Sequence, residues 1–276
     1  MTVQIVTDSG ADLPPALAAA HGITVVPLQV LIDGASYRDG VDLTPQMFYE
    51  KLRTAKKLPQ TSQPTPHDAE SAYRAAAERG PVVGVHLSSA LSGTWETATM
   101  TARHIAESIR VFDSRNGSAG LGLQALRAAE LARDGASAAE IWAHLEAWRE
   151  ETRTLVALNT LENAVKGGRV SPLAGMAARL LHVKPIVHVT RAGKVEPIDR
   201  VRGRERALDR VLELAGELRR DWSDRRVAVA HGGCPEEARA FVRRVRERFS
   251  PAEVLETEIG ATIGTYSAEG AILFSF

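Results

Sequence analysis

Hydroxyl side chains gather in one short segment, residues 88–94, that could bind an anion. The segment, Ser-Ser-Ala-Leu-Ser-Gly-Thr, lies between an apolar run and a helical pattern. A loop of this kind before a helix presents backbone N–H groups and the positive helix end to a negative ligand. A hydroxyl-capped helix with nothing bound is the alternative, but the density of hydroxyls favours an anion site around Ser92, Gly93 and Thr94.

Two other polar segments follow apolar runs, and we expect them to support this loop. Asp8 and Ser9 stand at the end of the first apolar run, while Asp113 and Ser114 follow a later one. Asp12 stands before Leu-Pro-Pro and resembles a helix N-cap followed by prolines in the first turn. The residues expected to support the site are Asp8, Ser9, Ser89, Asp113 and Ser114.

A fourth polar segment, residues 61–66, reads Thr-Ser-Gln-Pro-Thr-Pro. Thr65 is the expected N-cap of a helix that starts at the second proline. Thr61 and Ser62 precede that cap and supply further hydroxyls, which need partners if they are buried. Thr61 and Ser62 are therefore candidate ligand contacts.

The motifs of common catalytic and metal sites do not occur in the sequence. No Gly-Lys-Ser/Thr follows the glycine of residues 88–94, and no Gly-x-Ser-x-Gly is present. The eight histidines lack metal-ligand spacing, and Cys234 is the single cysteine, so no internal disulfide can form. We expect neutral donors to hold the anion. This favours a ligand with one anionic head, because burying an unpaired charge is costly.

The charge of the chain is balanced as a whole and uneven along its length. The 276 residues carry 34 basic and 34 acidic side chains, which argues against a dedicated nucleic-acid-binding protein. Residues 1–150 have a net charge of −4 and residues 151–276 of +4. Ten basic side chains fall within residues 166–206. This strip is either solvated surface or a docking face for an acidic partner or a nucleotide phosphate.

The first half must position most of these loops, and its pattern predicts an α/β fold. Short β-branched runs alternate with helical stretches, which is typical of a parallel sheet covered on both faces. Ligands of such sheets bind beyond the carboxyl ends of the strands. The expected strands are residues 3–7, 23–32, 82–87 and 109–112. The expected helices are residues 14–20, 44–53, 66–79, 94–107, 118–133 and 138–149.

The second half mixes hairpins with helices and predicts a smaller α+β domain, residues 151–276, after an α/β/α domain of residues 1–150. An Arg-Ala-Gly turn joins two of its strands as a hairpin. The expected strands are residues 154–158, 185–190, 194–201, 227–231 and a final pair near 254–263 and 271–274. The expected helices are residues 161–165, 172–181, 204–220 and 236–249.

The polar segments taken together resemble the DegV family of bacterial fatty-acid-binding proteins, the FakB subunits of fatty acid kinase. The matching motifs are Thr-Asp-Ser with Asp-Leu-Pro in residues 7–14, Thr-Ser-Gln-Pro-Thr in 61–65, Ser-Ser-x-Leu-Ser-Gly-Thr in 88–94, Lys-Gly-Gly-Arg-Val in 166–170 and Lys-Pro-Ile in 184–186. Each motif is weak alone, but five in order span nearly the whole chain.

The resemblance implies an N-terminal domain related in fold to dihydroxyacetone kinase, with an acyl tunnel between it and the second domain. It implies that Thr61 and Ser92 lie near the fatty acid carboxylate, and that the arginine of Gly-Gly-Arg lies on a face that meets a kinase subunit. Our candidates for that docking face are Arg169, Arg202 and Arg204.

One position departs from the family pattern. The family's C-terminal segment has a histidine where this chain has Tyr266, and Gly-Pro where this chain has Ala268 and Glu269. A phenol can donate a hydrogen bond to a carboxylate but cannot become cationic. Tyr266 is therefore a candidate carboxylate contact, with packing between the domains as the alternative.

An acyl chain also needs apolar walls. We expect residues 23–32 and a helix over 173–181, in which Met176 and Leu180 fall on neighbouring turns, to be candidates. Ordinary core packing is the alternative for both.

We therefore expect a cytoplasmic protein without a membrane segment, a metal or a cofactor. It would hold a long-chain fatty acid and offer the carboxylate to a separate ATP-dependent kinase. The alternatives are a small-molecule phosphotransferase, because of the kinase-related fold, and an acyl hydrolase that uses Ser92.

Overall fold

The first sheet confirms the predicted parallel arrangement. The computed structural model describes residues 1–171 and 183–276. Four parallel strands stand in the order β2-β1-β6-β7. Their bounds are Gln4–Asp8 for β1, Thr24–Val26 for β2, Val82–His86 for β6 and Ile109–Asp113 for β7. The central strands β1 and β6 are buried on both faces, so their sequences are mostly apolar, whereas the edge strands β2 and β7 each expose one residue.

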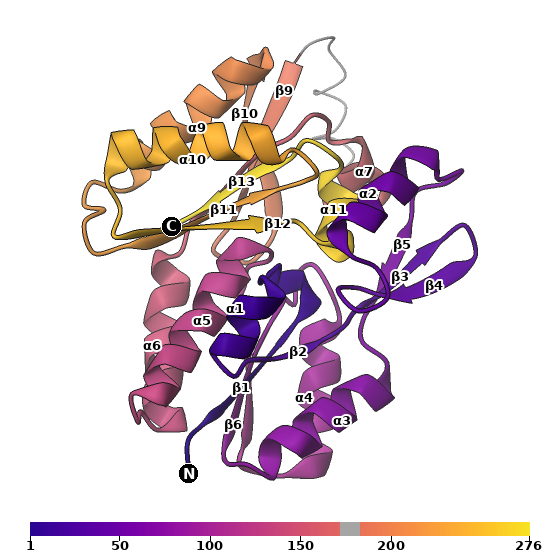
Figure 1. The fold of residues 1–276 in the computed structure, drawn as a ribbon, viewed down its shortest axis with the longest axis vertical. Helices are drawn as coiled ribbons and strands as arrows, with labels where there is room; N and C mark the ends of the chain where they lie inside the picture. Colours follow the sequence, from indigo (N-terminus) through magenta and orange to yellow (C-terminus); the bar gives the residue numbers. More distant parts are fainter. Residues whose placement is uncertain (172–182) are drawn as a thin grey trace.

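Helices cover both faces of this sheet, as Figure 1 shows. Successive strand residues point to opposite faces, so Ile5 joins the core beneath α5 while Val6 joins the core beneath α3. The first layer consists of α1 (Pro15–Ala20), α5 (Ala119–Arg133) and α6 (Ala138–Glu151). The second consists of α3 (Pro66–Ala77) and α4 (Thr94–Ile105).

A small antiparallel sheet projects from this domain, where a single long strand over residues 23–32 was expected. That prediction is wrong because β2 ends at Val26, before Pro27, and the chain starts a second sheet in the order β4-β3-β5. The bounds are Gln29–Ile32 for β3, Ala35–Arg38 for β4 and Gln60–Ser62 for β5, with α2 at Pro45–Thr54. The β3–β4 turn has positive φ at Asp33 and Gly34, as tight hairpins require.

The second half forms a six-stranded sheet in the order β10-β9-β8-β13-β11-β12. The expected hairpin of β9 and β10 is confirmed, with Gly193 at positive φ in its turn. The expected final strand pair is wrong, because β12 and β13 each pair with β11 and not with each other. The bounds are Thr154–Ala157 for β8, Val183–Val189 for β9, Val195–Arg202 for β10, Arg226–His231 for β11, Glu253–Glu258 for β12 and Ile272–Ser275 for β13.

Helix α5 packs against both the four-stranded sheet and the six-stranded sheet. One face of the six-stranded sheet packs against α9 (Arg204–Leu218) and α10 (Pro235–Phe249). On the opposite face, Leu123 of α5 joins a core with Val156 and Ala228. The helix therefore lies between the sheets, as Figure 1 also shows. The domain boundary near residue 150 stays a prediction.

Helix α11, Ala261–Ser267, was not expected. The predicted strand over residues 254–263 ends at Glu258, and the chain then turns into this helix. The short helix α7, Glu162–Lys166, packs beside α11.

Candidate functional site

A cavity of about 800 Å³, its open part included, lies between the two sheets. The loops after β6 and β7 contribute Leu87, Leu91 and Gly117 to its wall, and α11 contributes Ile263. The six-stranded sheet supplies an apolar wall of Val156, Leu158, Val187, Val189, Val195 and Leu273.

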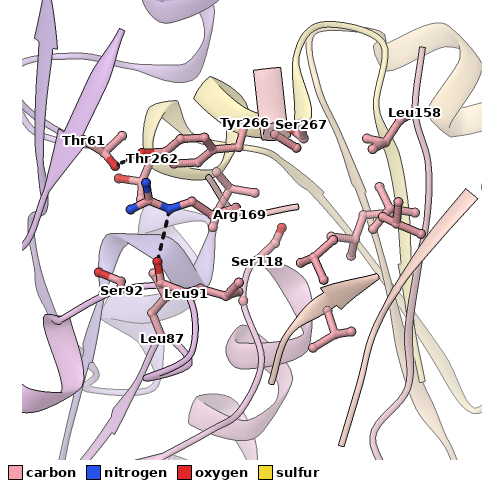
Figure 2. A pocket seen from close by; sticks show the side chains of 18 residues that line it. Thr61, Leu87, Leu91, Ser92, Ser118, Leu158, Arg169, Thr262, Tyr266 and Ser267 are labelled. Atoms are coloured by element: carbon pink, nitrogen blue, oxygen red, sulfur yellow. Dashed lines mark hydrogen bonds between the residues drawn. The ribbon is translucent and has the colours of Figure 1, made fainter. Parts of the chain in front are cut away.

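Four polar side chains gather at one end of the cavity, away from Leu158 (Figure 2). The hydroxyls of Thr61 and Tyr266 are 2.6 Å apart and share a hydrogen bond. The guanidinium of Arg169 stacks 4.5 Å from the centre of the Tyr266 ring. Ser92 completes this group, which we call the polar end: Thr61, Ser92, Arg169 and Tyr266.

Arg169 gives the polar end a positive charge that the neutral-donor expectation did not include. Its Nε donates to the Leu91 carbonyl at 3.3 Å, and its Nη1 donates to the Gly167 carbonyl at 2.7 Å. Within residues 1–171 and 183–276, no carboxylate lies within ion-pair distance of Arg169. Carbonyls and a ring face leave the charge uncompensated, so the site can receive an anion by a charge-assisted hydrogen bond.

Two glycines explain how Arg169 reaches this place. Gly168 has φ +75°, a conformation that side chains disfavour, and the chain reverses there after α7. Gly167 lies against Tyr266 so closely that a Cβ atom would come within 2.3 Å of the ring. The Gly-Gly-Arg segment therefore provides a tight turn and a platform for the phenol.

The other predicted carboxylate contacts are not part of the cavity lining. Ser62 follows Thr61 on β5 and is exposed, because adjacent strand residues point in opposite directions. Thr94 is buried in the first turn of α4, where its Oγ1 bonds with Ser92 Oγ at 2.8 Å. Gly93 is the N-cap residue of that helix. The structure thus brings Thr61, Ser92 and Tyr266 together and leaves Ser62, Gly93 and Thr94 beside or behind them.

Helix α11 places Tyr266, and a carboxylate distant in sequence starts that helix. The backbone N–H groups of Ala261 and Thr262 donate to Asp39 at 3.0 and 3.1 Å. This satisfies two donors at the helix start that have no partner within the helix. Burial raises the pKa of Asp39.

Asp12 does not cap α1, contrary to expectation. Asp12 has a left-handed backbone conformation, with φ 49°. Its Oδ1 accepts a hydrogen bond from the Gly260 N–H at 2.8 Å. The N-cap residue of α1 is Pro14, which has no side-chain cap. Burial raises the pKa of Asp12 well above its usual range.

Asp8 and Ser9 lie behind the cavity and hold its loops. The carboxylate of Asp8 accepts hydrogen bonds from the N–H groups of Gly10 and Leu87 and from Nδ1 of His86, each at 2.9 Å. On the other side of its ring, Nε2 of His86 lies 2.6 Å from the Tyr73 hydroxyl. Ser9 donates to Asp39 at 3.1 Å. These contacts fix the loop that leads to Ser92.

Asp113 joins two loops in the same way. Its carboxylate accepts from the Ser89 hydroxyl at 2.6 Å and from the Arg115 N–H at 2.9 Å. Ser114 is buried, and its hydroxyl donates to the Asn116 carbonyl at 3.1 Å. Both residues lie outside the cavity lining and order its surroundings.

Three further hydroxyl residues line the cavity without having been singled out as ligand contacts. These are Ser118, Thr262 and Ser267. The hydroxyls of Ser118 and Thr262 lie beside the carboxyl groups of Asp12 and Asp39. The buried hydroxyl of Ser267 has no hydrogen-bond partner within the described part of the chain, so a ligand or water can satisfy it. The polar residues 262–267 were visible in the sequence, but their inward direction depends on the unexpected helix α11.

The three predicted docking arginines do not form one face. Arg169 lines the cavity, and Arg202 is exposed at the end of β10. Arg204 is half-buried, with Nε 2.9 Å from Glu237 and Nη2 2.6 Å from the Gly270 carbonyl. Arg204 therefore already has structural partners, while the docking role of Arg202 stays a prediction.

Among the described residues, neither segment predicted to line the acyl chain is seen in the wall of the cavity. Residues 23–32 form β2, β3 and their connection, and none of them lines the cavity. The predicted helix 173–181, with Met176 and Leu180, lies outside the described residues. In the part of the chain that the structure describes, no helix is long and apolar enough to cross a membrane, and no group of three potential metal ligands was found.

Comparisons with known proteins place the chain among fatty-acid-binding relatives. A family model described as uncharacterised proteins of the DegV family matches residues 2–276. A DegV domain-containing protein from Deinococcus radiodurans is 37% identical, with 99% of this chain and 97% of the relative covered. A structure describing fatty acid binding by a DegV family protein from Thermus thermophilus superposes with a TM-score of 0.90 at 34% identity and covers 100% of this chain and 99% of that chain. A stearic-acid-binding protein from Eubacterium ventriosum also gives a TM-score of 0.90, at 26% identity, with 99% and 97% covered. Fatty acids are thus ligands of similar structures, and no cofactor is indicated.

Proposed function

The chain belongs to the DegV family, and from this premise we propose that it binds one long-chain fatty acid in the cavity between the sheets. The carboxylate lies at the polar end, where Thr61, Ser92 and Tyr266 donate hydrogen bonds and Arg169 supplies the positive charge. The acyl chain runs along the apolar wall of the six-stranded sheet. The observation that carries this proposal is a largely apolar cavity in which Thr61, Ser92, Arg169 and Tyr266 lie together at one end.

The two parts of the site contribute differently to binding. Burying about a dozen methylenes contributes on the order of 10 kcal/mol, at roughly 0.8 kcal/mol each, before the cost of ordering the chain. The apolar wall therefore dominates affinity. The polar end decides the direction of the ligand, because a carboxylate buried at the apolar end would lose its hydration without gaining donors.

The protein does no chemistry alone in this proposal but presents the carboxylate to a separate ATP-dependent kinase, which forms the acyl phosphate. The exposed Arg202 belongs to the docking face for that kinase, and the complex is cytoplasmic. ATP turnover or release of p-nitrophenol from acyl esters by the isolated protein, lost in Ser92→Ala, would contradict this and favour a phosphotransferase or a hydrolase.

Native mass spectrometry of freshly purified protein tests the binding proposal. We expect an added mass equal to one long-chain fatty acid, which disappears after delipidation and returns on adding stearic acid. A protein that is always ligand-free and does not take up stearic acid would overturn the proposal.

A further inference from the structure

A second cavity, of about 830 Å³ with its open part included, adjoins the acyl cavity. It lies at the beginning of β8 and the end of β9, beneath the last residue of α9, Leu218. The loop between β7 and α5 separates the two cavities. Its first part, Arg115 and Asn116, lines the second cavity, while Gly117 and Ser118 line the first.

Four arginines and a histidine line this second cavity. They come from five parts of the fold: the β7–α5 loop, the end of α6, the connection from α6 to β8, β9 and the β9–β10 turn. We call them the arginine cluster: Arg115, Arg149, Arg153, His188 and Arg191. Positive side chains repel one another, so their convergence needs negative charge to offset it.

The two inner arginines contact neutral groups. Arg149 donates from Nη1 to the Asp113 carbonyl at 3.0 Å and stacks 4.7 Å from the centre of the Phe112 ring. Its Nε is buried and makes no hydrogen bond within residues 1–171 and 183–276. Arg153 donates from Nη1 to the carbonyls of Glu150 and Thr152 at 2.7 and 2.9 Å. The hydrogen bonds of both guanidinium groups thus go to neutral carbonyl acceptors.

The carboxylates near the cavity offset part of the positive charge of the cluster: Asp113, Glu150 and Glu146 act on Arg149, and Glu150 and Glu151 act on Arg153. Glu150 is 3.7 Å from Arg115 Nη1, but the two side chains are 50% and 40% exposed, and surface pairs of this kind contribute little. The Asp113 carboxylate is occupied by Ser89 and by the Arg115 N–H. Glu151 pairs with arginines outside the cavity, Arg219 and Arg225. Glu196 lies beside His188 across the β9–β10 hairpin.

The pKa shifts of the clustered groups agree with their burial and their closeness to one another. Burial lowers the pKa of Arg149, and neighbouring Arg115 lowers it further. Burial and then Arg191 lower the pKa of Arg153. Burial lowers the pKa of His188, and Glu196 partly opposes this shift. An anion placed among these groups would relieve the repulsion.

We propose that the second cavity binds a small molecule through a phosphate or pyrophosphate group held by the arginine cluster. Guanidinium groups match phosphate oxygens in pairs, which makes arginine well suited to this anion. The lining also offers the polar side chains of Asn116 and Thr190 for the rest of the ligand. This site is separate from the acyl site and does not depend on the proposed fatty acid binding.

Calorimetric titration of the full chain with pyrophosphate at low ionic strength tests the proposal. The variants are Arg115→Gln and Arg191→Gln, whose side chains are partly or fully exposed, so the fold should persist. Each should weaken binding about 10-fold, as expected for one charged hydrogen bond. The matched control is Arg239→Gln, an exposed arginine on α10, which should bind like the parent.

The outcomes separate this site from general attraction to a basic surface. Saturable binding with one pyrophosphate per chain, weakened only by the two cluster variants, supports the site. Absence of saturable binding, or equal weakening by Arg239→Gln, overturns it. Thermal unfolding verifies that the variants are folded. Uptake of stearic acid by Arg191→Gln should match the parent, so failure of the acyl proposal would be seen separately.

Discussion

The phenol of Tyr266 lies where the sequence resemblance predicts a histidine, and its contacts bear on that predicted exchange. Its hydroxyl bonds with Thr61, and its ring supports the guanidinium of Arg169. A histidine would offer a hydrogen bond and a titratable charge in one ring. In the proposed head-group site, the hydrogen bond comes from Tyr266 and the permanent charge from Arg169, so that site would not need an imidazole.

Thr61→Ala and Ser92→Ala should each weaken binding of a long-chain fatty acid. Loss of one hydrogen bond to a carboxylate costs about 1.5–3 kcal/mol, which corresponds to roughly 10- to 100-fold in Kd. Fluorescent fatty acid displacement measures this, with Ser36→Ala, an exposed residue on β4, as the matched control. Unchanged affinity in both site variants would place the head group elsewhere, next to Ser118 or Thr262.

Tyr266→Phe and Tyr266→His separate the two roles of the phenol. The Phe variant keeps a ring beside Arg169 but removes the hydroxyl, so it should lose affinity about as much as Thr61→Ala. Because Thr61 and Tyr266 share one hydrogen bond, the double variant should lose less than the sum of the single losses. The His variant should bind more tightly as the pH falls through about 6.5, the ordinary pKa of histidine, while the parent should not show this step.

At the scale of elements, the turn after α7 and the helix α11 depend on each other through one contact. Gly167→Ala would bring a Cβ atom within 2.3 Å of the Tyr266 ring, so the ring must move away from Thr61. We expect a stability loss of about 1–3 kcal/mol, as for other overpacked sites, and weaker fatty acid binding. Urea denaturation and ligand displacement measure the two effects.

The control for this prediction is Gly216→Ala within α9, where the nearest atom would be 3.6 Å from the new Cβ. Alanine favours a helix interior over glycine by about 1 kcal/mol, so this variant should become more stable. Adding Tyr266→Ala should make Gly167→Ala nearly neutral, because the clash is then gone. Equal losses with and without the ring would show that Gly167 matters for another reason.

The sequence predicted those elements whose structure is determined by nearby residues and missed one that depends on a contact distant in sequence. The strands β1 and β6 were recognised because burial on both faces leaves mostly apolar runs. Helix α11 was missed because its sequence, Ala-Thr-Ile-Gly-Thr-Tyr-Ser, is rich in poor helix formers. Its start is stabilised by Asp39, more than 200 residues earlier, and such a contact leaves no local signal.

In the candidate site, too, residues in local sequence patterns were predicted, and residues placed by distant contacts were not. Ser92 and Thr61 were singled out because each lies in a hydroxyl-rich segment, which is a local pattern, and because the family resemblance implied that both lie near the carboxylate. Arg169 was assigned to a docking face, since nothing local indicates that its guanidinium turns inward over Tyr266. The inward-pointing Thr262 and Ser267 required knowledge of the helix that carries them.

At the scale of the whole molecule, the balanced charge is the sum of two unlike halves that are joined at the cavity. The N-terminal half reaches the C-terminal helix α11 through two buried carboxylates, Asp12 and Asp39. The Thr257 hydroxyl adds a hydrogen bond to the carbonyl of Asp12. Two buried carboxyl groups therefore hold the two halves together behind the cavity.

This junction predicts a specific dependence of stability on pH. Because burial raises the pKa of Asp12, the folded protein binds more protons there than the unfolded chain, in which the pKa is about 3.9. The free energy of unfolding contributed by Asp12 is therefore greatest below about pH 4 and falls as the pH rises through the higher pKa of the folded state. Asp12→Asn keeps an acceptor for the Gly260 N–H and removes the titration.

Urea denaturation between about pH 3 and pH 8 should show Asp12→Asn gaining stability relative to the parent as the pH rises. Asp42 provides a control of opposite sign, because hydrogen bonds from Arg38 lower its pKa to about 2. Its contribution is present above the unfolded pKa and is lost as the pH falls toward 2, so Asp42→Asn should show a small loss at neutral pH that disappears in acid. A stability difference between Asp12→Asn and the parent that does not change with pH would mean that Asp12 titrates normally. In that case the hydrogen bond between Asp12 and Gly260 would not become stronger as the pH falls, contrary to what the burial of Asp12 indicates.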